Sequence, residues 1–293
     1  MKTKSNKIKD IENYALSELK NKYPHNEIQS FINILFNSYA GINSAHLKAF
    51  PEETVNESSL LNIVLAVQRL KKYEPIQYIL GYTEFSGLKI KVTPDVLIPR
   101  PETEELVYKI LSDIRQNTSD FGQKTLDIID LCTGSGCIAL ALNKYIENSC
   151  VKGVDISDKA LEIAKENNKN LNLNVNFCKY DVLNPQESET KYDIIVSNPP
   201  YVTQKEKIIM EKNVLDYEPS LALFVKDDNP LVFYEKIAVF AHKNLKKNGK
   251  IYLETNSALT ESTFALFSQQ EYIARIEKDI FNKDRFIFLQ KTV

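Results

Sequence analysis

The chain has 293 residues, 37 of them basic and 39 acidic, and a formal net charge of -2 at pH 7. This length suits two domains of ordinary size, and 43% hydrophobic residues are enough to build a buried core. The nearly balanced charge differs from the strongly basic profile of proteins that hold duplex DNA chiefly through its phosphates, so we expect no stable nucleic-acid binding.

The cysteines, histidines and apolar stretches exclude further classes. Four cysteines without paired CxxC spacing and only three histidines do not resemble a metal site, so we expect no metal. The longest apolar stretch, residues 60–67, is too short to span a membrane. The lysine-rich start lacks the apolar core of a signal peptide. We therefore expect a cytoplasmic protein without a membrane segment.

Residues 1–83 show only helical patterns. Hydrophobic residues recur at helical spacing in three runs, within residues 8–19, 28–36 and 60–70. Asn56 or Ser58 can cap the start of the third run. The pattern predicts a small helical bundle as the first domain, and its residues show no obvious catalytic chemistry.

The hydrophobic period changes in residues 84–100. Hydrophobic residues alternate with lysines across residues 88–92, which is typical of a strand with one solvated face, and Gly87 offers a turn before it. We expect a short β-hairpin here, as the connector between two domains. Pro101 can then take the first position of a helix, because its fixed φ suits that position.

Strands and helices alternate from about residue 125 onward. The pattern predicts five strands separated by helical runs, then two strands joined by a short loop that should pair antiparallel. The expected fold class is α/β, with an open, mostly parallel, Rossmann-like seven-stranded sheet in residues 101–293. The expected strands are residues 126–131, 150–155, 175–178, 192–197, 250–254, 272–277 and 285–290.

A glycine-containing loop follows the first of these strands, in the sequence Asp130-Leu-Cys-Thr-Gly-Ser-Gly136. Gly134 and Gly136 permit a sharp turn into a helix and let a ligand approach the backbone closely. The second strand ends at Asp155, where a ribose would offer its hydroxyl groups. A glycine pair alone also fits a simple tight turn; the acidic partner favours a nucleoside site.

The surroundings of the loop indicate which nucleotide it binds. No Gly-Lys-Ser/Thr follows, which excludes a P-loop. Asp130 would repel a pyrophosphate but attract the ammonium group of a methionine, so we interpret the loop as a site for S-adenosylmethionine rather than for a dinucleotide. Val182 follows the third strand, where the edge of an adenine can be bound.

The most informative motif is Asn-Pro-Pro-Tyr at residues 198–201, which ends the fourth strand. A planar amide nitrogen is a poor nucleophile, because its lone pair is delocalised. The side-chain oxygen of Asn198 can accept one of its N–H groups and the carbonyl of Pro199 the other. Both hydrogen bonds strengthen as the nitrogen attacks, and Tyr201 can pack on the flat target. The motif therefore predicts methyl transfer to a planar nitrogen, with Asn198, Pro199 and Tyr201 as catalytic residues.

The chain resembles the HemK/PrmC family of protein-glutamine methyltransferases over nearly its whole length. The Asn-Pro-Pro-Tyr motif is shared with DNA adenine methyltransferases, whereas the segment Ile98-Pro-Arg-Pro-Glu-Thr-Glu104 points to this family. The resemblance implies methyl transfer from S-adenosylmethionine to the glutamine side-chain amide in the Gly-Gly-Gln motif of class I peptide chain release factors, with S-adenosylhomocysteine as the product. The resemblance also extends over residues 75–81, 130–136 and 217–224.

The resemblance also implies where the ligands bind, and it gives the helical domain a role in substrate recognition. Cys132 stands where many members of the family have glycine. The residues expected around the glutamine are Asn198, Pro199, Pro200 and Tyr201. The residues expected around the cofactor are Asp130, Cys132, Thr133, Gly134, Ser135, Gly136, Asp155, Val182 and Asn198.

Two other interpretations stay open at this point. An adenine N6-methyltransferase acting on nucleic acid would use the same Asn198 motif on a flipped base, with Tyr201 stacked on it. A non-catalytic adaptor that binds release factors would keep the fold but lack turnover. We expect a monomer.

Overall fold

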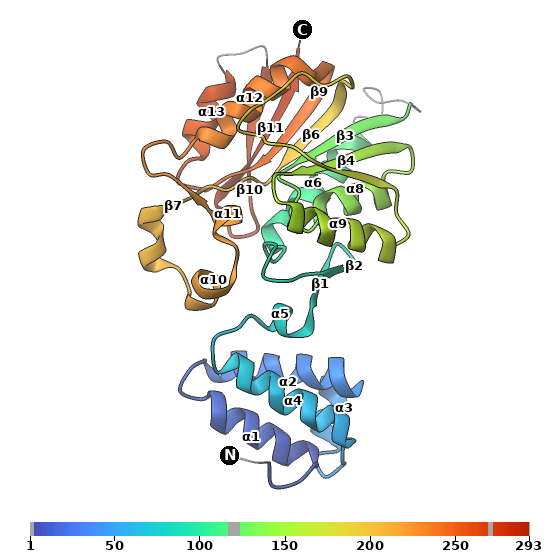
Figure 1. Cartoon of the computed structure of the whole chain (residues 1–293), viewed down its shortest axis with the longest axis vertical. Coiled ribbons are helices and arrows are strands. Elements are labelled where there is room, and N and C mark those ends of the chain that lie inside the picture. The colour runs from blue at the N-terminus through green and yellow to red at the C-terminus, as the bar shows by residue number, and fades with distance from the viewer. Residues whose placement is uncertain (1–2, 117–123, 269–271, 293) are drawn as a thin grey trace. The chain divides into compact units, whose positions relative to one another are not determined.

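The computed structural model describes residues 3–116, 124–268 and 272–292 (Figure 1). It consists of a group of helices and of a sheet covered by helices. No helix within these described ranges is long and apolar enough to cross a membrane.

The chain divides into two compact units. The helical unit comprises Met1–Gly81 together with Glu211–Tyr217, and the sheet unit comprises Tyr82–Met210 together with Glu218–Val293. The division into a helical domain, a connector and a catalytic domain stays a prediction. The segment Glu211–Tyr217, which that division places in the catalytic domain, clusters with the helical unit.

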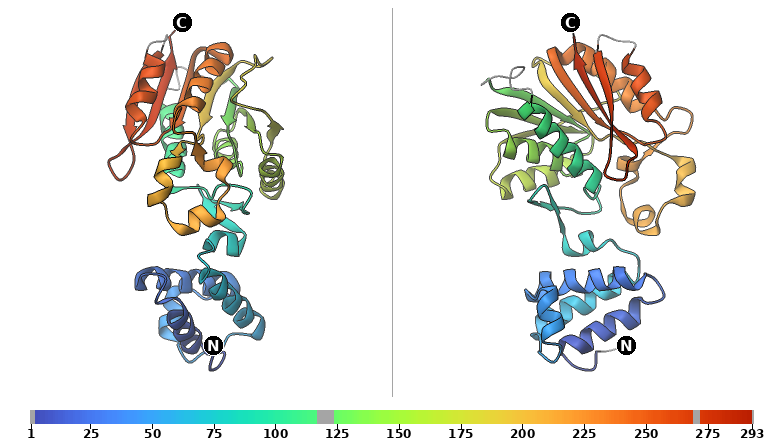
Figure 2. Two further views of the ribbon diagram at one scale, coloured as in Figure 1. Left: turned by 60° about the vertical axis from the view of Figure 1, so that its left-hand side comes forward. Right: turned by 180° about the vertical axis from the view of Figure 1, so that it is seen from behind.

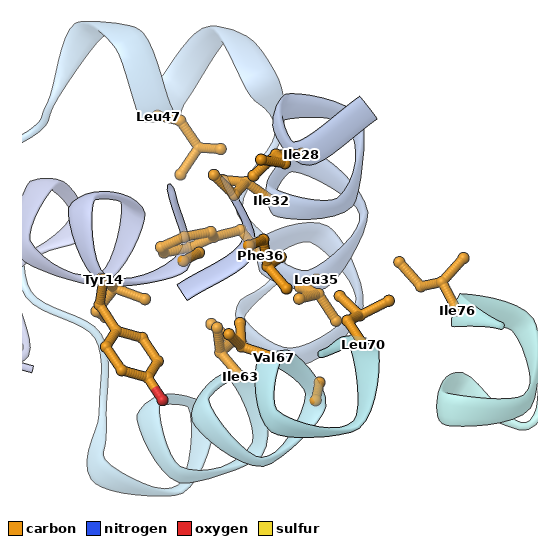
Figure 3. Close-up of a cluster of buried hydrophobic side chains, with 14 of the residues drawn as sticks. Tyr14, Ile28, Ile32, Leu35, Phe36, Leu47, Ile63, Val67, Leu70 and Ile76 are labelled. Atoms are coloured by element: carbon orange, nitrogen blue, oxygen red, sulfur yellow. The ribbon is translucent and has the colours of Figure 1, made fainter. Parts of the chain in front are cut away.

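The helical unit is built from short helices, five of which share one apolar core: α1 (Ile8–Leu19), α2 (His25–Ala40), α3 (Ser44–Ala49), α4 (Glu57–Leu70) and α5 (Ile76–Leu80). The later helix α10 (Lys212–Tyr217) belongs to the same unit. Phe36 of α2 and Val67 of α4 are almost completely buried in this core (Figure 3). The side-chain oxygen of Asn56 accepts a hydrogen bond from the backbone N–H of Ser59 at 2.8 Å. This confirms one of the two caps expected for α4.

The sheet unit contains a seven-stranded sheet. In spatial order its strands are β10 (Tyr272–Lys278), β11 (Asp284–Lys291), β9 (Leu245–Glu254), β6 (Tyr192–Ser197), β3 (Leu126–Leu131), β4 (Ser149–Asp155) and β5 (Val175–Lys179). β11 is antiparallel to both of its neighbours, and the other neighbouring pairs are parallel. This confirms the predicted mostly parallel α/β sheet and the antiparallel pairing of its last two strands.

Helices flank this sheet and bury both of its faces (Figure 2). They are α6 (Pro101–Gln116), α8 (Cys137–Tyr145), α9 (Asp158–Asn170), α12 (Val232–Asn244) and α13 (Thr260–Ser268). Tyr234 of α12 and Phe267 of α13 share a core cluster with Ile129 of β3 and Ile195 of β6. Alternate residues of the same strands, such as Ile194, are equally buried, because a parallel sheet is covered on both faces.

The order of the strands brings β3 and β6 together, although β4 and β5 lie between them in the chain. The chain runs outward from β3 through β4 to β5 and then returns to β6 on the other side of β3. In open parallel sheets, ligands bind at such a reversal, outside the carboxyl ends of the strands. Leu131 pairs with Ser197, so the segments that follow β3 and β6 leave the sheet side by side.

The prediction of a helical run between the third and fourth strands is wrong. Residues 180–191, all of which the structure describes, form turns and contain no helix. The carboxylate of Asp181 accepts a hydrogen bond from the backbone N–H of Leu183 at 2.9 Å, and Pro185 follows. Local side-chain-to-backbone bonds and proline both compete with a helix, which explains the difference.

The sequence analysis did not predict several short elements between β6 and α12. They are β7 (Val202–Thr203), the 3-10 helix η1 (Gln204–Ile209), α10, α11 (Ser220–Leu223) and β8 (Phe224–Val225). β7 and β8 form a small parallel pair of their own. Each element is too short to show a hydrophobic period, which is the signal on which the sequence analysis depends.

A short hairpin precedes α6. Its strands are β1 (Tyr82–Phe85) and β2 (Leu88–Lys91), and the two turn residues Ser86 and Gly87 both have positive φ, as in a type I′ turn. Asn167 of α9 holds the hairpin against the rest of the sheet unit. Its side chain accepts a hydrogen bond from the backbone N–H of Lys91 at 2.7 Å and donates to the carbonyls of Lys91 and Ser135 at 3.1 and 3.0 Å. This one buried amide therefore links the hairpin, α9 and the loop after β3.

Replacing Asn167 with alanine should lower the free energy of unfolding by about 2–4 kcal/mol, because the change leaves three backbone groups without their partner. Chemical denaturation monitored by circular dichroism measures this loss. Asn170→Ala is the matched control, because Asn170 is exposed on the same helix and should change stability by less than about 0.5 kcal/mol. Equal losses in both variants would contradict the proposed fastening role.

Candidate active site

A cavity of about 230 Å³ opens at the carboxyl ends of β3, β4 and β6. Its walls are largely apolar, with a few polar groups converging from the strand ends, which is the usual character of a small-molecule site. Among the described residues, the lining includes six of the predicted site residues. These are Cys132, Gly134, Asp155, Val182, Asn198 and Pro200.

The loop after β3 is held in a tight, left-handed conformation. Cys132, Gly134 and Gly136 have φ values of 62°, 56° and 82°. Glycine adopts such values freely, whereas other residues seldom do, so the conformation of Cys132 is unusual for a residue with a side chain. The backbone N–H of Thr133 donates to the carbonyl of Val154 at 2.9 Å, which ties the loop to β4.

Asp155 stands at the end of β4 and lines the cavity. Its carboxylate accepts hydrogen bonds from the backbone N–H groups of Gly134 and Ser157, both at 2.9 Å. Burial raises the pKa of Asp155, and these backbone bonds oppose the rise. Each carboxylate oxygen keeps a second lone pair, so the oriented side chain can still accept hydrogen bonds from a ligand's hydroxyl groups.

The segment after β5 forms another wall of the cavity. Tyr180, Asp181, Val182 and Leu183 all line it, and Ile156 lines it from the end of β4. The side chain of Val182 is buried, whereas Ile156 is partly open to solvent. Apolar side chains together with the carboxylate of Asp181 suit the flat face and polar edge of an adenine.

Four of the residues predicted at the cofactor lie in or beneath the loop, outside the described lining: Asp130, Thr133, Ser135 and Gly136. Asp130 is completely buried and accepts a hydrogen bond from the hydroxyl of Thr133. Burial raises its pKa to about 7, although Thr133 and the backbone N–H of Ala139 lower it. These contacts stabilise the loop from its buried side. Direct contacts of the four residues with the cofactor stay predictions.

The Asn-Pro-Pro-Tyr segment leaves β6 beside the glycine loop. The hydroxyl of Ser197 donates to the carbonyl of Leu131 at 2.7 Å and so joins the ends of β6 and β3. Asn198 and Pro200 line the cavity, whereas Pro199 and Tyr201 are not part of its described lining. Tyr201 donates to the carboxylate of Glu254 at 3.2 Å, and burial raises the pKa of its hydroxyl well above the usual value.

The cavity has a further wall that the sequence analysis missed. It is formed by Pro94–Leu97, which precede α6, and by Pro219, Leu221 and Ala222 around α11. Glu218 holds the two segments together: its buried carboxylate accepts from Arg100 at 2.7 Å and from the backbone N–H of Ile98 at 3.4 Å. The first segment directly precedes the motif Ile98–Glu104, and the second lies within residues 217–224, so the family resemblance was the signal that could have found this wall.

Two comparisons bear on the fold and its class. Residues 111–216 match the family model of the methyltransferase small domain, and residues 10–81 match that of the PrmC N-terminal domain. A methyltransferase from Pyrococcus furiosus has a similar structure, with a TM-score of 0.50 and 20% identity over 71% of this chain and 90% of its own. At that identity the likeness shows the fold. Fold and family model together define a methyltransferase.

Relatives of known name identify the family. The release factor glutamine methyltransferase of Flavobacterium psychrophilum is 40% identical over 281 residues, which cover 96% of this chain and 98% of the relative. That of Bacteroides thetaiotaomicron is 41% identical over 279 residues, covering 94% and 96%. The chain therefore belongs to the family of release factor glutamine methyltransferases. This confirms the resemblance seen in the sequence and does not favour an adenine N6-methyltransferase.

The two glycines of the loop should respond differently to substitution. A Cβ on Gly136 would lie 2.8 Å from the ring of Phe177, whereas a Cβ on Gly134 meets nothing within 4 Å. Both changes strain a positive φ, and Gly136→Ala adds a clash. We expect Gly136→Ala to lower the free energy of unfolding by about 2–4 kcal/mol and Gly134→Ala by about 1 kcal/mol. Urea denaturation of the two variants measures the difference; a larger loss for Gly134→Ala would contradict the packing described for the loop.

Proposed function

We propose that this protein transfers the methyl group of S-adenosylmethionine to the side-chain amide nitrogen of the glutamine in the Gly-Gly-Gln motif of class I peptide chain release factors, leaving S-adenosylhomocysteine. The observation that carries the proposal is that Asn198, at the end of β6, and Asp155, at the end of β4, line the same cavity. One cavity thus joins a group suited to an amide with a group suited to a ribose. The names of the relatives support the choice of substrate.

The residues around the cavity fit S-adenosylmethionine. Asp155 would accept the ribose hydroxyl groups, and the apolar wall at Val182 would hold the adenine. The backbone at Cys132 and Gly134 leaves room for a ligand to approach closely, because no side chain fills the space at Gly134. When bound, the cofactor supplies an electrophilic methyl group on a sulfonium.

The protein's own residues orient and activate the acceptor. The side-chain oxygen of Asn198 would accept one N–H of the glutamine amide and the carbonyl of Pro199 the other. Held by both hydrogens, the amide turns the face of its nitrogen toward the methyl group. These bonds strengthen as positive charge develops on the nitrogen, so they stabilise the transition state more than the ground state. The remaining contribution is alignment of the two reactants.

The motif's other residues would complete the glutamine site. Pro200 lines the cavity beside Asn198 and would shape its wall. The ring of Tyr201 would pack on the flat amide while its hydroxyl stays anchored on Glu254. Together, Asn198, Pro199, Pro200 and Tyr201 form the proposed substrate site.

We further propose that the helical unit recognises the release factor and that the protein acts as a monomer in the cytoplasm. Residues 10–81 match the PrmC N-terminal domain, whereas residues 111–216 match the more general methyltransferase small domain. This supports a role of the helical unit that is specific to the family. The substrates implied by the relatives' names belong to translation, which supports the compartment.

Labelled S-adenosylmethionine tests the proposed function directly. The purified enzyme should label an unmodified class I release factor, and a Gln→Ala change in its Gly-Gly-Gln motif should abolish the label. Asn198→Ala should lower kcat by about a hundredfold or more, because one of the two amide acceptors is lost. Filter-bound radioactivity and mass spectrometry of the Gly-Gly-Gln peptide measure both effects.

Two controls sharpen this assay. Asn170→Ala removes an exposed asparagine from the same unit and should leave the rate unchanged. Duplex DNA, offered in place of the release factor, should take up no label. Label on DNA alone would contradict the proposed substrate but would agree with S-adenosylmethionine as the cofactor.

A further inference from the structure

A buried carboxylate lies behind the Asn-Pro-Pro-Tyr segment. Glu254 is the last residue of β9 and is 1% exposed. Its Oε2 accepts a hydrogen bond from the hydroxyl of Thr103 at 2.7 Å, and its Oε1 accepts from the hydroxyl of Tyr201 at 3.2 Å. Its main-chain carbonyl accepts from Tyr234 at 3.0 Å. A charge buried this deeply is costly unless hydrogen bonds or an opposite charge compensate for the lost water.

Thr103 extends this network to the proposed substrate site. The side-chain nitrogen of Asn198 donates to the hydroxyl oxygen of Thr103 at 3.0 Å, while the same hydroxyl donates its proton to Glu254. The chain of hydrogen bonds therefore has one direction, from Asn198 through Thr103 to Glu254. Its end point is an acceptor with no proton of its own to give when ionised.

This direction fixes the orientation of the Asn198 carboxamide. If the carboxamide turned over, its Oδ1 would face the oxygen of Thr103, whose only proton is already bonded to Glu254. Two acceptors would then meet without a proton between them, at a threonine that is buried away from water. The network thus leaves Oδ1, rather than Nδ2, for the cavity that Asn198 lines.

We propose that Thr103 and Glu254 are positioning residues for methyl transfer, which hold Asn198 with its side-chain oxygen toward the acceptor amide and hold Tyr201 beside it. The inference rests on the proposed function, because only an N–H substrate needs an acceptor at that point. It also gives a role to Thr103, which lies within the segment that marks the family, because this residue connects α6 to the end of β6.

The charged and titratable groups around Glu254 act on its pKa in both directions. Burial raises the pKa of Glu254 to about 7, and the hydrogen bonds from Thr103 and Tyr201 together with the charge of Arg285 oppose the rise. The negative charge of Glu102 on α6 raises this pKa further, and Tyr234 on α12 also faces the carboxylate. The two donors thus favour the ionised form that accepts from both of them, and the one-way direction of the network holds above about pH 7, where Glu254 is ionised.

Thr103→Val tests the proposal, because it keeps the shape of the side chain and removes only the hydroxyl. The carboxamide of Asn198 then loses its fixed partner and can turn over. We expect kcat on the release factor to fall by about tenfold to a hundredfold, with KM for S-adenosylmethionine unchanged within about twofold. Thr103→Ser keeps the hydroxyl and should restore most of the rate.

Two further variants separate positioning from simple destabilisation. Thr263→Val is the matched control, since Thr263 is completely buried and its hydroxyl makes no hydrogen bond among the described residues. It should leave kcat unchanged. Glu254→Gln replaces one acceptor oxygen with a donor, so it can serve only one of Thr103 and Tyr201, and we expect kcat to fall with KM for the cofactor again unchanged.

A measurement that does not depend on methyl transfer separates the failure of this inference from the failure of the proposed function. The side-chain NH₂ of Asn198 should exchange slowly with solvent in ¹⁵N-labelled wild-type enzyme and in Thr103→Ser, and at least about tenfold faster in Thr103→Val. Wild-type enzyme that fails to methylate the release factor would contradict the proposed function alone. Unchanged kcat or unchanged exchange in Thr103→Val, or no rescue by serine, would overturn the positioning role.

Discussion

The parallel pairing of β3 with β6 is the constraint on which the site depends. Leu131 lies opposite Ser197 in this pairing, so the next residues along the two strands, Cys132 and Asn198, reach the edge of the sheet together. Both line the same cavity. The glycine loop and the Asn-Pro-Pro-Tyr segment are far apart in the chain, and it is the reversal of the strand order at β3 that makes them neighbours.

Buried polar groups then set the geometry that this pairing makes possible. Ser197 joins the ends of the two strands, Asp155 holds the backbone of Gly134, and Glu218 draws the wall at Ile98 toward α11. Each of these groups is costly to bury alone and favourable only when its partner is in place. Such groups therefore specify one arrangement of the loops more strictly than apolar packing would.

The same principle explains how the residues around Asn198 are arranged. Asn198, the side chain proposed to meet the substrate, directly follows β6, whereas the groups proposed to orient it come from α6 and β9. In the proposed mechanism, these two groups set which atom of the Asn198 carboxamide faces the substrate. Precise placement of a hydrogen-bond acceptor matters here, because the proposed catalysis requires no nucleophilic side chain of the protein, only orientation and electrostatic stabilisation.

The sequence predicted what local patterns encode. The alternation of strands and helices predicted the sheet, and the glycine loop, Asp155 and Asn198 belong to motifs with a strong local signature. The long-range contacts could not be predicted in this way. Thr103 lies in the segment that points to the family, but no local pattern connects it with Glu254, because the two residues are 151 positions apart in the chain. The prediction of a helical run between β5 and β6 was wrong because Asp181 and Pro185 favour turns. Single turn-favouring residues give a weaker sequence signal than a repeated hydrophobic pattern.

The most direct test of the account is a crystal structure of the enzyme with S-adenosylhomocysteine and a release factor bound. We predict that the nucleoside lies against Asp155 and Val182, and that the glutamine amide nitrogen lies within about 3.2 Å of both the Asn198 side-chain oxygen and the Pro199 carbonyl. A glutamine bound away from Asn198, or an Asn198 side chain that presents its nitrogen to the glutamine, would contradict the account.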